Sequence, residues 1–210
     1  MPNPEHQIQQ SQRCIEGKSV KMRLMLEEDT PLIVRWRNHP AVAKWLIQWE
    51  PLTEQAHLRY LNSARARGEL LLTFLDLNGT PIGTGAIYDF DHPRKVAEWG
   101  RLCVNPDGEH SLAIVESSYL AVRYGFERLS LSRIHARCSE GNGGARRLLE
   151  FIGFRQEGVR PQHLAAPDGY RDVIEYGLLK HDFSQQATRV EKLLYRSAGG
   201  VSPRMERTLE

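Results

Sequence analysis

The chain alternates between segments with the period of a helix and segments with the period of a β-strand. From residue 110 to 129 apolar residues recur at spacings of three and four, which indicates an amphipathic helix with one buried stripe. This stripe consists of Leu112, Val115, Tyr119, Val122, Phe126 and Leu129. We expect shorter helices over residues 30–38, 53–68 and 144–153, because typical cap residues such as Thr53 and Gly153 stand at their ends.

Strand-like segments surround these helices. The first begins near Val20, two more lie within residues 69–90, and single strands are expected over 95–104, 132–138, 154–160 and 169–179. The pair within 69–90 is joined at Asn78-Gly79, which is typical of a tight antiparallel hairpin. A meander of strands followed by a strand-helix-strand crossover predicts an α/β fold, a mixed sheet with helices on its faces.

Composition limits the classes of protein to consider. The chain has 210 residues, 40% of them hydrophobic, as expected for one globular domain. We expect a disordered or loosely docked arm over residues 1–18, a domain over 19–183 and a C-terminal extension over 184–210. The formal charge is only +2, from 28 basic and 26 acidic residues, which argues against nucleic acid or a membrane surface as partner.

The cysteines and the hydropathy pattern suggest a cytoplasmic protein. Cys14, Cys103 and Cys138 are widely spaced and odd in number, which argues against a disulfide framework and against a cysteine-based zinc site, so no metal is expected. The first 14 residues lack the apolar region of a secretion signal. A run of about 18 apolar residues, as a membrane span needs, does not occur either.

Three stretches together resemble a known family. They are EWGRLCVNPDGEHSLAIVE, YGFERLSLSRIHARCSEGNGGARRLLEFIGF and RQEGVRPQHLAAPDGYRDVIEYGLL. The most specific positions are Asn142, Ala145, Leu148, Leu149, Glu150, Gly153, Phe154, Glu157, Gly158 and Asp172. From Val20 to Phe183 the chain resembles the GNAT superfamily of acetyl-CoA-dependent N-acetyltransferases, in particular its ribosomal-protein alanine and nucleotide-sugar amine branch. The resemblance implies a GNAT fold, a mostly antiparallel sheet of about seven strands, splayed between strands 4 and 5 and flanked by helices.

The resemblance also implies a site for acetyl-CoA as co-substrate. The main chain of Leu102, Cys103 and Val104 would pair with the pantetheine arm. The pyrophosphate would lie against the window Glu109, His110, Ser111, Leu112, Ala113 and Ile114. This window departs from the family pattern, because glutamate replaces its basic residue and leucine its central glycine. The helix start still offers unpaired N–H groups, although Ser111 could simply cap the helix and His110 could be a solvated turn residue.

Other residues are candidates for contacts and for chemistry. Asn142 and Ala145 would contact the coenzyme, although an Asn before two glycines is also a common turn former. The tyrosine that often acts as general acid in the family is replaced by Leu149. Glu98 is the candidate general base, which requires a raised pKa, and the alternative is a buried ion pair with Arg101 or Arg137.

The segment VRWRNHPAVAKWLIQWE, residues 34–50, is expected to wall the acceptor pocket. The candidate acceptor-binding residues are Trp36, Arg37, Asn38, Trp45 and Tyr88, with Trp49 nearby. WRNHPAV resembles nucleotide-sugar amine acetyltransferases, in which aromatic rings stack on sugars and arginine pairs with phosphate. Alternatively, Trp36 and Trp45 simply pack a helix onto the sheet.

These features favour direct transfer of an acetyl group to a primary amine. Cys103 and Cys138 lie in predicted core strands, so a covalent enzyme intermediate is not expected. A small or nucleotide-linked amino sugar is the favoured acceptor, ahead of a protein N-terminus. The rival from another class is a catalytically degenerate GNAT-fold protein that only binds acyl-CoA. The resemblance allows a homodimer.

Overall fold

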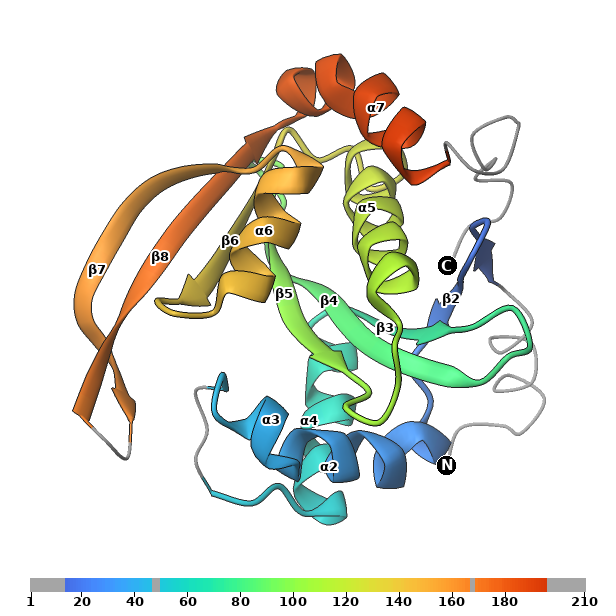
Figure 1. Cartoon of the computed structure of the whole chain (residues 1–210), viewed down its shortest axis with the longest axis vertical. Coiled ribbons are helices and arrows are strands. Elements are labelled where there is room, and N and C mark those ends of the chain that lie inside the picture. The colour runs from blue at the N-terminus through green and yellow to red at the C-terminus, as the bar shows by residue number, and fades with distance from the viewer. Residues whose placement is uncertain (1–13, 47–49, 167–168, 196–210) are drawn as a thin grey trace.

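The computed structural model describes residues 14–46, 50–166 and 169–195, and they form one eight-stranded sheet with helices on both faces (Figure 1). The strand order is β1-β2-β3-β4-β5-β6-β8-β7. The strands are β1 Ile15–Glu16, β2 Lys21–Leu24, β3 Leu70–Leu75, β4 Pro81–Asp91, β5 Val96–Val104, β6 Arg133–Ser139, β7 Arg155–Ala166 and β8 Gly169–Leu179. The expected mixed and mostly antiparallel sheet is confirmed, and the short β1 raises the strand number from about seven to eight.

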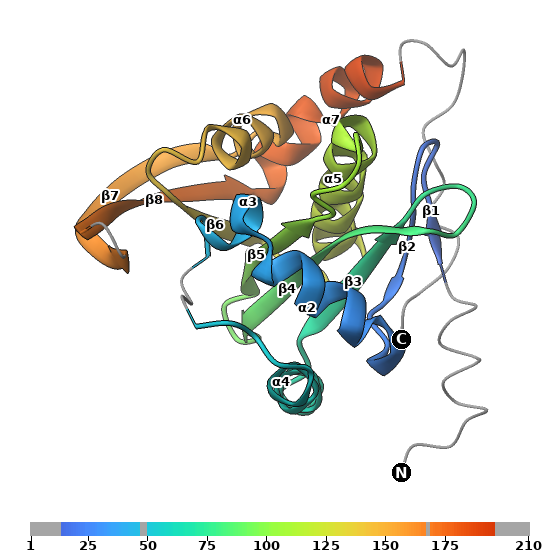
Figure 2. The same ribbon diagram turned by 60° about the horizontal axis from the view of Figure 1, so that its bottom comes forward.

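The helices divide between the two faces of the sheet, as Figures 1 and 2 show from two directions. One face carries the 3-10 turn η1 Glu27–Asp29 and the helices α2 Thr30–Asn38, α3 Pro40–Ala43 and α4 Glu54–Ala66. The other face carries α5 Ser111–Glu127, α6 Gly143–Ile152 and α7 Lys180–Leu194. The helices expected near residues 30, 53, 110 and 144 are all present, whereas the short α3 was not predicted.

Local sequence signals explain several element ends. Thr53 caps α4 by accepting a hydrogen bond from the Ala56 amide at 3.2 Å. Gly153 ends α6 in the left-handed region, with φ 114°, where a side chain would be strained. The β3–β4 hairpin turns at Asn78-Gly79 as predicted, and the Asp76 carboxylate accepts the amides of Asn78 and Thr80 at 2.9 and 2.8 Å.

The sheet opens between β5 and β6. These parallel strands pair over only three residues each, ending at Glu98 and His135, although β5 continues to Val104 and β6 to Ser139. A register shift against β4 and a positive φ of 53° at Arg101 mark a bulge in β5 just beyond this point. In Figure 1 the two strands separate toward their carboxyl ends. The expected splay between the fourth and fifth predicted strands is therefore confirmed, at β5 and β6.

Helix α5 is buried more widely than one stripe. Its buried residues include the polar Glu116, Ser117 and Ser118, because α7 and the start of the chain cover its second side. Phe183 of α7 packs on Tyr119 and Phe126 with ring centroids 5.5 and 5.1 Å apart. The prediction of a single stripe was too narrow, since these covering segments are distant in sequence.

Strand β1 and helix α7 extend the fold beyond the domain bounds predicted at residues 18 and 183. Strand β1 lies before the first boundary and pairs with β2. The Glu116 carboxylate accepts the amides of Lys18 and Ser19 at 2.7 and 2.8 Å, which joins this end of the chain to α5. Helix α7 runs across the second boundary.

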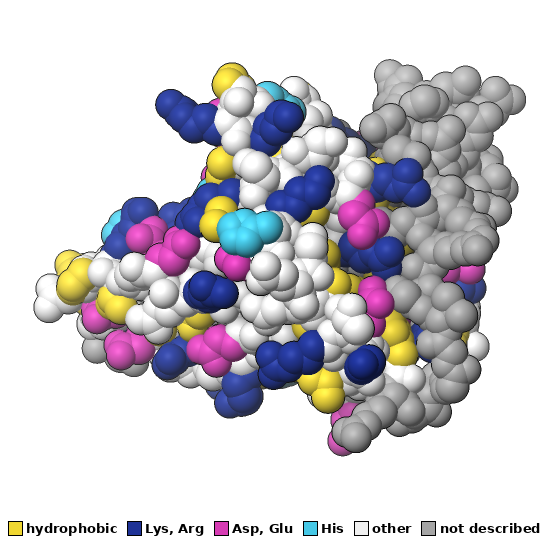
Figure 3. Space-filling view, turned by 90° about the horizontal axis from the view of Figure 1, so that it is seen from above, with side chains coloured by type: hydrophobic (Ala, Val, Ile, Leu, Met, Phe, Trp, Pro, Cys, Tyr) yellow, Lys and Arg dark blue, Asp and Glu magenta, His cyan; other side chains and the backbone are white. Residues whose placement is uncertain are grey.

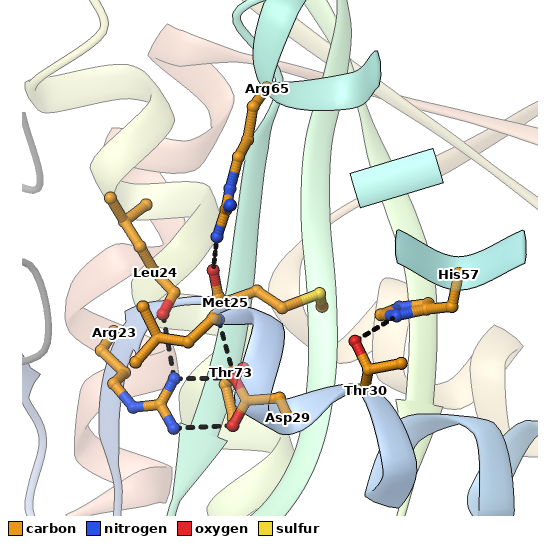
Figure 4. Close-up of polar contacts among 9 residues, drawn as sticks. Arg23, Leu24, Met25, Asp29, Thr30, His57, Arg65 and Thr73 are labelled. Atoms are coloured by element: carbon orange, nitrogen blue, oxygen red, sulfur yellow. Dashed lines mark hydrogen bonds and ion pairs between the residues drawn. The ribbon is translucent and has the colours of Figure 1, made fainter. Parts of the chain in front are cut away.

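A buried ion pair fixes the position of α2 (Figure 4). Arg23 donates two hydrogen bonds of 2.7 Å to Asp29, which also accepts from the Leu26 amide and the Thr73 hydroxyl. Burial alone would raise the pKa of Asp29, but these donors, Arg23 above all, lower it. The carboxylate is therefore ionised and ties η1, β2 and β3 together at the point where α2 begins.

Candidate active site

The open end of the split lies at the first turns of two helices. Helix α5 follows β5 and α6 follows β6, so both helices begin where the two strands diverge (Figure 1). At α5 the N-cap residue is His110, and no side chain caps the helix. Ser111 is thus a helical residue and not the cap, and the first-turn N–H groups remain available to an anion.

The residues that replace the family's usual loop pattern do not block this opening. Leu112 is 56% exposed, and Glu109 is exposed as well. His110 is half-buried and folds back against Gly108. Arg35 of α2 pairs with Asp107 at 3.1 Å and so holds the preceding turn against α2. Glu109 and Leu112 are therefore exposed to solvent and are not packed over the start of α5. Contact between residues 109–114 and coenzyme stays a prediction.

Beyond Glu98, the edge of β5 that faces β6 pairs with none of the described strands. Leu102, Cys103 and Val104 lie on this edge, so their main chain is placed where a pantetheine arm could pair with it. The Cys103 side chain points away from solvent, and burial raises the pKa of its thiol to about 11. The thiol is protonated at neutral pH and is a poor nucleophile.

On the β6 side, Asn142 is the N-cap of α6. Its side-chain oxygen accepts a hydrogen bond from the Ala145 amide at 3.1 Å. This oxygen therefore stabilises the local turn, as the alternative interpretation predicted. Ala145 is half-buried against the core, and Leu149 is buried within it. A leucine offers no proton donor at this position. Coenzyme contacts of Asn142 and Ala145 stay predictions.

Glu98 is not suited to be a general base. Its carboxylate accepts a hydrogen bond of 2.6 Å from the Tyr88 hydroxyl and bonds of 3.1 and 2.8 Å from Arg137, and the His135 Nε2 lies 3.4 Å away. Burial alone would raise the pKa of Glu98, but hydrogen bonds from His135, Arg137 and Tyr88 lower it to about 2. The raised pKa that a general base would require is thus not found, and the structure shows the alternative, an ion pair with Arg137.

Three of the predicted acceptor-binding side chains are used within the protein. Trp36 is 0% exposed and packs α2 onto the sheet. Asn38 donates to and accepts from the Leu52 main chain at 2.9 and 2.7 Å, which fixes the following loop. Tyr88 donates its hydroxyl hydrogen to Glu98. The assignment of Trp36 to acceptor binding is therefore corrected, because its side chain is fully buried. Acceptor contacts of Asn38 and Tyr88 stay predictions, and Trp49 lies outside the described residues.

Arg37 and Trp45 remain as acceptor candidates. Burial is the main influence on the pKa values of His57 and Cys103, and the positive charge of Arg37 lowers both, so its guanidinium lies near α4 and β5. Among the residues that the structure describes, Arg37 has no acidic partner. Trp45 lies against Gly141 of the β6–α6 turn, and Lys44 lies 5.1 Å over its ring. The segment after α3 thus reaches across to β6.

Sequence reasoning missed a cluster on the same face. Arg101, at the bulge of β5, lies 3.7 Å over the ring of Tyr88 and donates to the Tyr60 hydroxyl at 2.7 Å and to Glu69. Arg101 was considered only as a partner of Glu98, but the bulge turns it toward α4. His135 was also missed, although its alternation with Arg137 along β6 places it on the face of Glu98.

These features define a class of protein. The sheet is split between parallel strands, two helices begin at the opening, and an unpaired strand edge leads inward. This is the fold of acyl-coenzyme A-dependent transferases. The model of the acetyltransferase (GNAT) domain matches residues 20–155, and the chain belongs to this family. It is an acetyl-CoA-dependent N-acetyltransferase. Acetyl-CoA is its co-substrate, and no cluster of potential metal ligands occurs among the described residues.

Individual relatives differ in their named activity. The chain is 25% identical over 183 residues to the "Putative ribosomal N-acetyltransferase YdaF" of Bacillus subtilis strain 168, covering 81% of this chain and 96% of that one. It is 22% identical to spermidine N(1)-acetyltransferase of Escherichia coli K12, covering 79% and 88%. A GCN5-related N-acetyltransferase from Brucella melitensis matches the fold with a TM-score of 0.74 at 22% identity, covering 94% and 92%.

Within the described ranges, no helix is long and apolar enough to cross a membrane.

Proposed function

We propose that this protein acetylates the primary amine of a small molecule that also carries an anionic group, such as a nucleotide-linked amino sugar, by direct transfer from acetyl-CoA. The observation that carries this proposal is the half-buried charge of Arg37 on the α2 and α4 face of the split, which has no acidic partner among the residues described. A buried or partly buried cation is normally paired, so a ligand anion is the natural partner.

The other charges near this face support an anionic acceptor. The carboxylates of Glu98 and Glu69 are occupied by Arg137 and Arg101, respectively. Neither is available to bind the several ammonium groups of a polyamine. Spermidine, the substrate named for one relative, would bring further positive charge close to Arg37.

Coenzyme and acceptor would approach from opposite sides of the split. The pyrophosphate would lie at the start of α5, with Asn142 and Ala145 on the other side of the opening, and the pantetheine arm would follow Leu102 to Val104. The acceptor would enter from the face of α2 and α4, where Trp45 could stack on a sugar or base ring. The high pKa of the Cys103 thiol supports direct transfer over a covalent enzyme intermediate.

A protein N-terminus is the second acceptor to be tested, because one relative is named as a ribosomal N-acetyltransferase. An acidic groove would favour a basic protein partner, but the carboxylates of Glu98 and Glu69 are both paired with arginines. A degenerate acyl-CoA-binding protein would bind coenzyme without releasing free thiol. We also propose a reducing, cytoplasmic location, which the free thiols of Cys103 and Cys138 support.

The experiment is a comparison of acceptors by release of the CoA thiol from acetyl-CoA. The panel holds a nucleotide-linked amino sugar, the same amino sugar without the nucleotide, spermidine, and a short peptide with an N-terminal alanine. We expect the highest kcat/KM with the nucleotide-linked sugar. Arg37→Gln should lower this value by about 10- to 100-fold, as expected for the loss of one charge-assisted hydrogen bond.

Arg59→Gln is the matched control, because Arg59 is exposed on α4 and should not contact the acceptor. The proposal is contradicted if spermidine or the peptide is the better substrate, or if Arg37→Gln leaves the preference unchanged. Acetyl-CoA binding without thiol release for any amine would favour the degenerate binding protein.

A further inference from the structure

At the closed end of the split, where β5 and β6 are still paired, an accessible histidine lies beside a buried carboxylate. Pairing of β5 with β6 ends at Glu98 and His135, which are direct partners in register. The side chain of His135 is 35% exposed and that of Glu98 only 4%, and the His135 Nε2 lies 3.4 Å from a Glu98 carboxylate oxygen. The carboxylate is thus enclosed, while the imidazole remains open to a ligand.

From this arrangement we infer that His135 accepts the proton of the acceptor amine and that Glu98 is the positioning residue that orients its imidazole. The inference rests on N-acetyl transfer to an amine and is independent of which amine is the acceptor.

The direction of β5 places the reacting end of the coenzyme near His135. Strand β5 runs from the closed end at Val96 to the open end at Val104, which leads into the turn before α5. An arm whose pyrophosphate lies at the start of α5 would therefore follow the unpaired edge from Val104 back toward Glu98. Its thioester would reach the region where pairing with β6 resumes, and His135 is the β6 residue at that point.

The face of the sheet is also the correct one for an acceptor. Glu98 lies directly opposite Tyr88 on β4, and the side chain of Tyr88 packs with residues of α2 and α4. Residues paired in register point to the same face, so His135 projects to this side as well. The amine would meet the imidazole on the face from which it attacks the thioester.

The chemistry divides between the two residues. Glu98, with its pKa lowered to about 2, is ionised and is too weak a base to take a proton from an ammonium group near neutral pH. An imidazole changes protonation between about pH 5 and 8, which suits this task. A carboxylate near one ring nitrogen favours the tautomer in which that nitrogen carries hydrogen, leaving the other free to accept a proton.

The step balances as follows. The acceptor ammonium gives one proton to the His135 imidazole, which later releases it to solvent. The freed nitrogen lone pair forms the C–N bond to the acetyl carbonyl carbon, and the C–S bond breaks with its electron pair on sulfur. The second proton lost by the nitrogen neutralises this thiolate. The products are the acetamide and the free CoA thiol.

The charges around His135 are largely matched. Glu98 faces it from β5 and is itself bonded to Tyr88 of β4 and Arg137 of β6. On the other side, Arg133 of β6 is paired with Glu157 of β7. The pKa of Glu157 is lowered mainly by its hydrogen bond from Arg133 and, to a smaller extent, by the charge of His135. The pH profile of the reaction is therefore measured with these five residues unchanged, except where one of them is the substitution under test.

The test is the pH profile of kcat/KM for the wild type, His135→Gln and Glu98→Gln, using whichever amine the acceptor panel identifies. In the wild type we expect activity to rise as the imidazolium loses its proton. His135→Gln should lower kcat by about 100-fold or more and remove this rise, while the Kd for acetyl-CoA stays within about twofold. Glu98→Gln should retain the rise but lower kcat, because the imidazole loses the carboxylate that orients it.

Two further variants separate this role from a structural one. His92→Gln, at an exposed histidine stacked on Phe90, should behave as the wild type. Added imidazole should restore part of the kcat that His135→Ala loses. A purely structural role of His135 would not give this rescue.

An unchanged kcat and an unchanged pH profile in His135→Gln would overturn the inference, as would a full pH response in His135→Ala without imidazole. If spermidine or the peptide proves to be the acceptor, only the proposal about Arg37 fails and this test is run with that amine. If no amine releases the CoA thiol, both proposals fail.

Discussion

At the scale of single residues, neighbours decide what an ionisable group can do. Glu98 and Glu69 both lie on the acceptor side of the sheet, and each is bonded to an arginine from a different element. These partnerships remove two carboxylates from the set of possible bases. Arg37, by contrast, has no acidic partner in the described part of the chain, which is why we propose an anionic acceptor although the whole chain is nearly neutral.

The ion pair of Glu98 should be visible in the pH dependence of stability. Its folded pKa of about 2 lies below the ordinary value of 4.5, so its contribution is fully present above about pH 4.5 and is lost as the pH falls toward 2. The contribution is on the order of 3 kcal/mol.

Urea unfolding of the wild type and Glu98→Gln between pH 2 and about pH 7 measures this effect. The variant should be less stable than the wild type at neutral pH, and the difference should shrink as the pH falls. Parallel curves for the two proteins across this range would show that the carboxylate is not held as the structure describes.

Residue roles within one short motif could not be read from the sequence. Trp36, Arg37 and Asn38 are consecutive, and all three were candidates for the acceptor. Only the structure shows that Trp36 faces the sheet, that Asn38 holds Leu52, and that Arg37 points between α4 and β5. Residues that follow one another on a helix point in directions about 100° apart, so adjacency in sequence does not imply a shared surface.

At the scale of elements, α7 packs against the core although its sequence has little apolar periodicity. The sequence beyond residue 184 was taken as an extension, because only its last residues showed an apolar pattern. The helix nevertheless covers α5 through Phe183 and adds Leu194 to the core, and α5 begins at the proposed coenzyme site.

Two neighbouring leucines of α7 test this packing. Leu194 is 9% exposed and belongs to the core, whereas Leu193 is 45% exposed. Leu194→Ala should lower the free energy of unfolding by about 2 to 4 kcal/mol, and Leu193→Ala by less than about 0.5 kcal/mol. Thermal or urea unfolding of the two variants measures the difference. Equal losses would mean that α7 does not form part of the domain.

Other elements were predictable because their signals are local. Asn78-Gly79 identified the β3–β4 hairpin, and the regular apolar spacing identified α5. Strand β1 has only two residues, and its attachment depends on Glu116, which is 98 positions from Lys18. The bulge at Arg101 likewise depends on the register between β4 and β5. Such long-range contacts leave no pattern in a short window of sequence.

At the scale of the whole molecule, the split in the sheet and the positions of single charges say more about the ligands than the net charge does. On the face drawn in Figure 3, basic and acidic side chains are interspersed. The family resemblance correctly implied the split sheet, but the positions of its charges came from the tertiary structure. The proposed mechanism requires that acetyl-CoA lies along β5 with its reacting end at Glu98 and His135.

A crystal structure with CoA and the preferred amine tests this claim most directly. We expect the pyrophosphate at the N–H groups that begin α5, the thiol sulfur near the end of β5–β6 pairing, the amine nitrogen close to His135, and the anionic group of the acceptor beside Arg37. A coenzyme bound elsewhere, or one whose thiol points away from His135, would contradict the account.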